Sequence, residues 1–316
     1  MTSHPSPVTR HLILALIGAN GMLAQAILQT VPDCYEVHCY DLPEFNMTDR
    51  EQVLSTLDSL RPDIVINCAA FTNVDGCETQ EDLAVQVNGT AVGFLAEAVR
   101  RIDATLVHIS TDYVFDGNKR EPYLEEDKVA PQSAYGRSKL VGEQAILGSG
   151  LKKYFIVRTS WLYGPGGNNF VETMIRLAAE REELRIVSDQ IGSPTFTHDL
   201  AEAIFNLLKL TDHSSPVTRH SSRTLSSPVT APYGLYHFSN SGQCSWHQFA
   251  EEIIALARQL DLPVKTQVVQ PIATEEYPLP AKRPAYSVFS KEKYQRMTGA
   301  AVPEWRDSLA LYLRSR

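Results

Sequence analysis

The chain has 316 residues, enough for one large or two modest domains, and its 43% hydrophobic and 21% charged residues are ordinary for a globular protein. A formal net charge of −8 argues against sequence-independent nucleic-acid binding, which depends on a cationic surface. The sequence lacks an apolar run of about 18 residues, so we expect no membrane span. The five cysteines form no C-x-x-C pair and favour reduced thiols in the cytoplasm over disulfides or a zinc site.

Residues 1–10 are polar and are predicted to form a flexible N-terminal arm rather than a signal peptide. From residue 11 to residue 164, apolar runs alternate with amphipathic segments. Strands are predicted at Leu12–Ile17, Glu36–Tyr40, Asp63–Cys68, Thr105–Ser110 and Phe155–Thr159, and helices at Met22–Gln29, Arg50–Leu60, Gln86–Arg100 and Ser138–Leu147. Apolar strands separated by helices indicate an α/β fold, a Rossmann-type doubly wound parallel sheet forming a dinucleotide-binding domain.

After Gly164 the pattern loosens, and residues 165–316 are predicted to form mainly a smaller α/β substrate-binding lobe with returns to the sheet. Helices are predicted at Val171–Arg181, Asp199–Leu210, Ser245–Gln259 and Val302–Arg314, and a return strand at Gly234–Ser239. Residues 211–232 are rich in Ser, Thr and Pro, and residues 215–220 repeat the sequence of residues 6–11. Because such a segment buries too little apolar area to offset its ordering entropy, we expect a mobile surface insertion.

A glycine-rich turn follows the first predicted strand. Gly18, Gly21 and Ala24 have the spacing of a dinucleotide phosphate-binding turn, in which glycine tolerates unusual backbone angles and the next helix presents free N–H groups. A tight strand-to-helix turn without a ligand has the same glycine spacing, but the position after the first strand favours binding. The cofactor-binding residues expected here are Gly18, Asn20, Gly21, Met22 and Leu23.

Asp41 lies just after the second predicted strand. An acid at this place accepts hydrogen bonds from the adenosine ribose and repels a 2′-phosphate, which favours NADH over NADPH. The alternative is a turn-forming or capping aspartate before Pro43. The sequence leaves both interpretations open.

Tyr135 and Lys139 are four residues apart, so on a helix they share one face. A reductase needs a proton donor for the oxygen of the reduced carbonyl, and a phenol with an ordinary pKa of about 10 is a poor acid–base catalyst at neutral pH. We expect the Lys139 ammonium to lower the pKa of Tyr135 and to bind the nicotinamide ribose. An exposed helix pair has the same spacing.

Two hydroxyl residues, Ser110 and Thr111, end the fourth predicted strand. Hydroxyls at the carboxyl end of a strand orient a substrate carbonyl and support its developing negative charge. The alternative is a simple cap at the strand end. Tyr113 either contacts the substrate or packs against its neighbours.

These motifs, together with Asn67–Ala70, resemble the extended short-chain dehydrogenase/reductase superfamily. Within that superfamily, several longer strings resemble the dTDP-4-dehydrorhamnose reductase family, and the resemblance runs from Leu12 to Leu311 apart from the insertion. The strings include Ala69–Asp75, Ser110–Gly117, Arg158–Tyr163, Gly167–Phe170 and Asp189–Thr195.

The resemblance implies reduction of the C4 ketone of dTDP-4-dehydro-L-rhamnose to dTDP-L-rhamnose by NADPH or NADH, a step toward cell-surface polysaccharide. Thr111, Tyr135 and Lys139 match the family's catalytic trio, with Tyr135 as the proton donor. Asn88 matches an asparagine that helps to hold the lysine and a water. Of the cofactor-lining residues, those implied on the adenosine side are Cys68, Ala69 and Ala70.

For the substrate, the resemblance implies binding by Thr111, Tyr113, Trp161, Asn169 and Arg283. Trp161 matches a sugar-contacting tryptophan, although a tryptophan is more often a core residue. Arg283 is a candidate for gripping the nucleotide diphosphate, with a surface cation as the alternative. Some relatives use magnesium, but the sequence shows no metal-ligand spacing that supports it.

Three other functions stay open: another nucleotide-sugar reductase, an epimerase, and a non-catalytic regulatory subunit resembling that of methionine adenosyltransferase. The superfamily's dehydratases follow the active-site threonine with Asp-Glu, whereas Thr111 is followed by Asp112 and Tyr113. The regulatory subunit lacks the Thr-Ser-Trp string found here at Thr159–Trp161. We expect the protein to bind a nucleotide-sugar substrate and to bind neither nucleic acid nor a membrane. A homodimer is an open alternative to a monomer.

Overall fold

The computed structural model describes residues 11–211 and 232–316. The predicted arm at 1–10 and nearly all of the predicted insertion at 211–232 therefore lie outside the described residues. No helix in the described ranges is long and apolar enough to cross a membrane.

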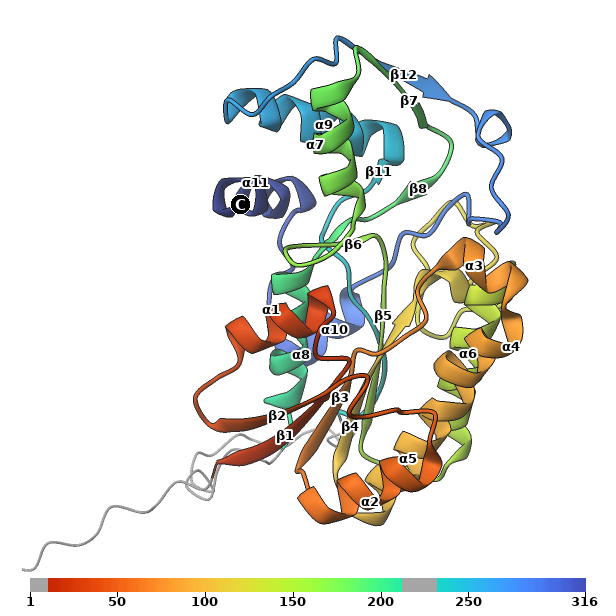
Figure 1. Cartoon of the computed structure of the whole chain (residues 1–316), viewed down its shortest axis with the longest axis vertical. Coiled ribbons are helices and arrows are strands. Elements are labelled where there is room, and N and C mark those ends of the chain that lie inside the picture. The colour runs from red at the N-terminus through yellow and green to blue at the C-terminus, as the bar shows by residue number, and fades with distance from the viewer. Residues whose placement is uncertain (1–10, 212–231) are drawn as a thin grey trace, which may run out of the picture.

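A six-stranded sheet forms the centre of the molecule (Figure 1). All of its paired strands run parallel, and their order is β10-β5-β4-β3-β1-β2. The order reverses beside β1, and ligands bind such sheets at the carboxyl ends next to this reversal. The strands are β1 (Leu12–Ile17), β2 (Tyr35–Tyr40), β3 (Ile64–Asn67), β4 (Thr105–Thr111), β5 (Tyr154–Thr159) and β10 (Gly234–His237).

Helices cover both faces of the sheet because successive strand residues point to opposite sides. In β1, Leu14 and Leu16 belong to one buried cluster, while Ala15 and Ile17 belong to the other. The first cluster includes side chains from α1 (Met22–Thr30) and α8 (Thr197–Leu208). The second includes side chains from α2 (Arg50–Leu60), α5 (Ala91–Arg101) and α6 (Ala134–Gly148). The predicted doubly wound α/β fold, including the return strand at the sheet edge, is confirmed.

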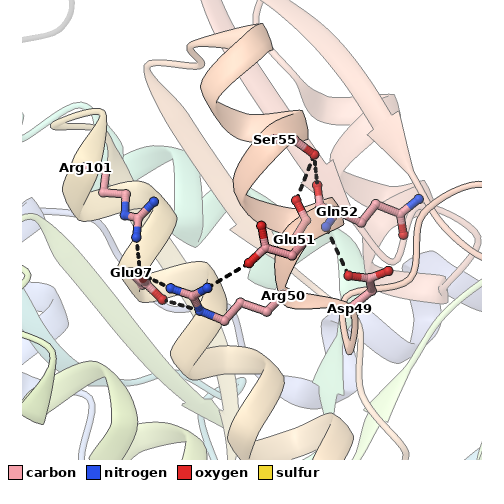
Figure 2. Close-up of polar contacts among 7 residues, drawn as sticks. All are labelled: Asp49, Arg50, Glu51, Gln52, Ser55, Glu97 and Arg101. Carbon is pink, nitrogen blue, oxygen red and sulfur yellow. Dashed lines mark hydrogen bonds and ion pairs between the residues drawn. The ribbon is translucent and has the colours of Figure 1, made fainter.

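Polar contacts join α2 to α5 on the outer side of the second face (Figure 2). Asp49 caps the N-terminus of α2 by accepting a hydrogen bond from the backbone N–H of Gln52. Arg50 then reaches across to Glu97 on α5 with two hydrogen bonds of 2.9 and 2.6 Å, and Arg101 binds the same carboxylate. Because these groups are exposed or only half-buried, we expect them to orient the two helices more than to stabilise them.

A second group of elements lies above the sheet in Figure 1. Its core holds Phe249, Trp305 and their neighbours, packed between helices and short strand pairs. A capping box between Ser245 and Gln248 begins its longest helix. The elements are α7 (Phe170–Glu180), α9 (Trp246–Gln259) and α11 (Trp305–Ser315), with strand pairs β6 (Leu162–Tyr163) with β9 (Thr195–Phe196), β7 (Glu183–Val187) with β12 (Val268–Ile272), and β8 (Ile191–Gly192) with β11 (Cys244–Ser245). The domain boundary at residue 164 stays a prediction.

Several short elements differ from the sequence prediction. The helix carrying Tyr135 and Lys139 begins at Ala134 rather than at Ser138, because Ser133 caps it by accepting from the N–H of Gly136. Both residues are therefore helical, as their proposed pairing requires. The predicted helix at Gln86–Arg100 begins with a π-helical turn (Gln86–Thr90) that leads into α5. The unpredicted helices are α3 (Val74–Thr79), α4 (Glu81–Val85), two 3₁₀ turns (Asp112–Val114 and Thr274–Glu276) and α10 (Glu292–Thr298).

Candidate active site

A cavity of about 660 Å³ lies at the carboxyl edge of the sheet. Segments that follow β1, β2 and β3 line it, together with the ends of β4 and β5 and one face of α6. It gathers most of the residues that the sequence singled out, namely Gly18, Gly21, Met22, Leu23, Asp41, Cys68, Ala69, Ala70, Ser110, Thr111, Tyr113, Tyr135, Lys139 and Trp161.

The glycine turn has the geometry of a phosphate cradle. Gly18 has a φ of +79°, and a Cβ built there would lie 2.5 Å from the backbone nitrogen of Ala69, so only glycine fits. Gly21 is the N-cap of α1 and supplies no side-chain cap, so within the described residues the N–H groups of the first helical turn have no side-chain acceptor. A helix N-terminus of this kind binds phosphate through its backbone and its dipole. The residues present thus fit a dinucleotide.

Asp41 holds this turn to the end of β2. Its Oδ2 accepts a 2.8 Å hydrogen bond from the backbone N–H of Asn20, and its Oδ1 accepts one of 2.8 Å from that of Leu42. The turn-forming alternative is therefore realised in the structure. Because both oxygens already have backbone donors, a ribose hydroxyl has to share them. Asn20 itself is placed by this contact beside the cradle.

Tyr135 lies inside the cavity, next to Thr111 and Tyr113. The Tyr135 and Tyr113 rings meet edge to face at 5.4 Å. Burial and the nearby Asp112 carboxylate raise the pKa of Tyr135, whereas its hydrogen bond with Thr111 lowers it. Lys139 is not among the groups that act on this pKa, so the expected lowering of the pKa by Lys139 is not found. The phenol is therefore protonated at neutral pH and has a proton to donate, although the raised pKa also makes it a weaker acid.

Lys139 lies one helical turn beyond Tyr135 and is only 2% exposed. Its Nζ donates a 2.7 Å hydrogen bond to the carbonyl oxygen of Ile109 on β4 and lies 3.4 Å from Nε2 of His108. Burial lowers the pKa of Lys139 to about 8, while Glu143 and Cys68 act in the opposite direction. A lysine with that pKa changes its protonation state near neutral pH. In both forms it has N–H groups that can donate hydrogen bonds to a ribose.

The side chains of the neighbouring residues Ser110 and Thr111 have different hydrogen-bond partners. Thr111 Oγ1 donates to Asp112 Oδ1 at 3.0 Å and accepts from the N–H of Tyr113, within the cavity. Ser110 Oγ instead donates to Glu143, whose carboxylate forms a buried ion pair with Arg158 at 2.7 Å. Both residues line the cavity, but the Ser110 hydroxyl is already engaged with Glu143, and support of the carbonyl by either hydroxyl stays a prediction.

Asn88 lies in the π-helical turn and is fully buried. Its Oδ1 accepts from the N–H of Phe71, and its Nδ2 donates to the carbonyl of Phe71 and to Ser138 Oγ. The carbonyl oxygen of Asn88 approaches Gly142 so closely that a Cβ there would lie 2.2 Å away. Asn88 thus joins the loop after β3 to α6, and its contact with Lys139 through a water stays a prediction.

Trp161 stacks on Trp246 with ring centroids 3.5 Å apart and planes 10° apart. Its φ of +48° is unusual for a bulky residue and holds the ring in place at a cost in backbone strain. Trp161 lines the first cavity, while Trp246 lines a second cavity of about 860 Å³ in the other group of elements. The stacked pair thus lies where the two cavities approach each other, and Tyr113 lines both.

The second cavity is bounded by α7, by β7 and by residues 274–285. Arg283 lines it, but its guanidinium is already paired with Asp75 at 2.6 and 2.7 Å. The surface-cation alternative does not describe this half-buried arginine. Asn169 caps α7 and donates its amide to the carbonyls of Gly164 and Gly167, so its amide is engaged within the chain. Substrate contact by either residue stays a prediction.

Some cavity residues are not among those that the sequence analysis singled out. Asp112 is 2% exposed, and burial raises its pKa to about 6. The loop after β2 also lines the cavity, with Phe45 and Met47 buried beneath it. The position of Asp112 directly after the candidate catalytic threonine is a usable signal, whereas the loop lacks any motif. In the described parts of the chain, no group of three or more His, Cys, Asp or Glu residues could hold a metal ion.

A parallel sheet with a phosphate cradle after β1 and a Tyr–Lys helix beside β4 defines a nicotinamide-dependent oxidoreductase. The model of the RmlD substrate binding domain family matches residues 12–316. The chain is 42% identical over 300 residues to the spore coat polysaccharide biosynthesis protein SpsK of Bacillus subtilis, covering 95% of this chain and 96% of SpsK.

The chain is also 37% identical over 303 residues to dTDP-4-dehydrorhamnose reductase of Burkholderia thailandensis, covering 95% and 98% of the two chains. The solved dTDP-4-dehydrorhamnose reductase of Bacillus anthracis, a complex with NADP, is 39% identical and superposes with a TM-score of 0.86 over 97% of this chain and 100% of that one. This chain belongs to the RmlD family of dTDP-4-dehydrorhamnose reductases, and it is an enzyme.

Proposed function

We propose that this enzyme reduces the C4 ketone of dTDP-4-dehydro-L-rhamnose to dTDP-L-rhamnose with NADPH or NADH. The observation that carries the proposal is the placement of Tyr135, Thr111 and Lys139 in the same cavity as the Gly18 phosphate cradle. The names of the similar enzymes and the NADP complex of one of them support both the reaction and the cofactor.

The cofactor is held, in this proposal, by the Gly18–Leu23 turn at its pyrophosphate and by the Cys68–Ala70 backbone beside its adenosine half. When bound, the reduced nicotinamide supplies the hydride. Lys139 lines the same cavity, and its N–H groups are proposed to bind the ribose hydroxyls of the cofactor. The Gly18 and Ala69 backbones lie so close together that these two parts of the site are positioned jointly.

Tyr135 acts as the proton donor to the substrate oxygen. Its hydroxyl is protonated at neutral pH, and its hydrogen bond with Thr111 orients that hydroxyl. Thr111 Oγ1 also lies at the carboxyl end of β4, where it can steady the negative charge that develops on the carbonyl oxygen.

The second cavity is proposed to hold the nucleotide half of the substrate. It combines apolar walls, including Phe170 and Met174, with the cations Arg181, Arg185 and Arg283. This composition suits a base and a diphosphate. Trp161, at the approach between the cavities, is proposed to contact the sugar, and Asn169 to support the same wall.

We further propose that the enzyme works in the cytoplasm and forms a homodimer. All five cysteines are free, which suits a reducing compartment. On α6, Val141 and Leu147 are exposed apolar residues that a second copy can cover. Sedimentation equilibrium measures the mass of the assembly, and the mass of a monomer at all protein concentrations would contradict the proposed homodimer.

The reductase proposal is tested by following oxidation of NADPH and NADH in separate reactions. The keto-sugar is generated in place from dTDP-glucose by a dehydratase and an epimerase. Oxidation that depends on the keto-sugar is expected with at least one cofactor. Cofactor binding without any keto-sugar-dependent oxidation favours the regulatory-subunit alternative or another nucleotide sugar.

A further inference from the structure

Three buried polar side chains form a line beneath the cavity. Asn67 at the end of β3 pairs in register with His108 on β4, and His108 faces Lys139 on α6. Their exposed fractions are 1%, 0% and 2%, so water does not compete for their hydrogen bonds. The role proposed above for Lys139 does not involve Asn67 or His108, so it does not explain why these two side chains are buried in contact with each other.

The orientation of the Asn67 amide follows from its backbone partner. The N–H of Ala69 lies 3.1 Å from Asn67 Oδ1, and only the oxygen of an amide can accept this hydrogen bond. The NH₂ group of Asn67 is therefore the end that faces His108, with Nδ2 3.1 Å from Nδ1 of the ring. Since this NH₂ group donates, Nδ1 of His108 has to be the unprotonated, accepting nitrogen.

The same ring is neutral at physiological pH. Burial, and secondly the charge of Lys139, lower the pKa of His108 well below its usual range. A neutral imidazole carries one proton, and with Nδ1 bare that proton is on Nε2. Nε2 lies 3.4 Å from Nζ of Lys139, so the ring directs an N–H at the lysine nitrogen.

We propose that His108 is a positioning residue for Lys139, which presents an N–H to Nζ because the Asn67 amide and the Ala69 backbone determine which ring nitrogen holds the proton. An ammonium has no lone pair to accept this hydrogen bond, whereas an amine has one. The arrangement therefore favours the amine form of Lys139 over the ammonium form. The nitrogen still donates to the Ile109 carbonyl.

The other ionisable groups that act on Lys139 come from two directions. Glu143, one turn further along α6, and Cys68, after β3, both favour the ammonium, while burial opposes it. In this proposal, the N–H of His108 acts in the same direction as burial and favours the amine. Because Lys139 is the residue proposed to bind the cofactor ribose beside Tyr135, the catalytic consequence rests on the proposed function, whereas the position of the ring proton does not.

The direct test is ¹⁵N NMR of the histidine side chains, in which two-bond couplings distinguish a protonated from a bare ring nitrogen. The His108 signals are assigned by their loss in His108→Gln. We expect Nε2 protonated and Nδ1 bare in the unaltered protein at neutral pH. A ring with the proton on Nδ1, or with both nitrogens protonated, would overturn the inference whatever the enzyme's activity.

Asn67→Asp provides the reversal. A carboxylate accepts from both the Ala69 N–H and Nδ1–H of His108, so the proton moves to Nδ1 and the bare Nε2 accepts from Lys139. We expect the His108 tautomer to switch and the titration of Lys139, followed by ¹³Cε NMR with Lys139→Arg for assignment, to move up by about one pH unit. The corresponding limb of the pH profile of kcat/KM should move with it.

Two controls distinguish the proposed change of the His108 tautomer from a simple effect of the added negative charge. Gln259→Glu adds the same charge at an exposed position on α9 and should leave the Lys139 titration in place. Asn67→Asp introduced into a His108→Leu background should shift the titration by much less than in the presence of the histidine. Equal shifts in both backgrounds would mean that Asn67→Asp acts by its charge and that His108 does not position Lys139.

Discussion

The guanidinium of Arg283 binds both carboxylate oxygens of Asp75, at 2.6 and 2.7 Å, across 208 positions of sequence. The backbone N–H of Ala281 donates to the same carboxylate at 3.0 Å. Asp75 belongs to α3, after β3, whereas Ala281 and Arg283 line the second cavity. This bidentate pair therefore ties a wall of the proposed nucleotide site to the sheet.

Asp75→Asn should loosen that wall. We expect a several-fold rise in KM for the nucleotide sugar with a smaller change in kcat, because the wall binds substrate without touching the reacting atoms. The free energy of unfolding should fall by about 1–2 kcal/mol, as for hydrogen bonds to a charged group. Steady-state kinetics and urea denaturation measure the two effects. Asp58→Asn, which breaks the exposed pair with Arg61, is the matched control and should change neither.

Thr111→Val and Ser110→Ala should separate the two neighbouring hydroxyls. Thr111→Val removes the hydrogen-bond partner of Tyr135 and should lower kcat about 10²-fold, as for loss of one oxyanion donor. Ser110→Ala removes a donor to the buried Glu143 carboxylate and should act mainly on stability, by about 1–3 kcal/mol. If Ser110→Ala instead lowers kcat as much as Thr111→Val, the assignment of faces is wrong.

Asp112→Asn should change the dependence of stability on pH. Burial raises the pKa of Asp112 to about 6, so between its unfolded value near 3.8 and 6 the folded state binds a proton that the unfolded state has lost. Stability from this group is present below that range and declines as pH rises through it. The asparagine variant should therefore gain up to about 3 kcal/mol relative to the parent at about pH 8, and nothing at about pH 3.5. Urea denaturation at both pH values measures the difference.

Asp41→Asn should weaken binding of both cofactors. The carboxylate holds the Asn20 and Leu42 backbone N–H groups, so its loss disturbs the phosphate turn that NADH and NADPH share. We expect dissociation constants to rise by a similar factor for the two, measured by the quenching of protein fluorescence. A selective gain for NADPH would instead favour repulsion of the 2′-phosphate as the main role of Asp41.

Much of the fold follows from local patterns. Leu14, Leu16 and their alternating partners are apolar on both sides of β1, which specifies a sheet covered on both faces. Gly18 and the Tyr135–Lys139 spacing predict the cofactor-binding part of the cavity. Phosphate binding and proton transfer each require particular residue types, and in this chain those residues lie within short sequence motifs. These features are visible without knowledge of distant contacts.

The remainder depends on contacts between distant segments. Nothing local distinguishes Ser110 from Thr111, and only the position of Glu143 on α6 shows which face the serine points to. The pairing of Asp75 with Arg283 likewise exists only in the folded chain. The sequence predicts the pKa shift of Tyr135 with the wrong sign, because the spacing reveals the lysine but not the burial of the phenol.

The central claim, that Tyr135 donates the proton in a reduction carried out in this cavity, is tested most directly by Tyr135→Phe. The measurement is keto-sugar-dependent oxidation of NADPH by the variant and the unaltered enzyme, with the affinity for NADPH determined on the same samples. The account predicts a loss of about 10²- to 10⁴-fold in kcat with NADPH affinity largely retained. Turnover of the phenylalanine variant at the parent rate would contradict it.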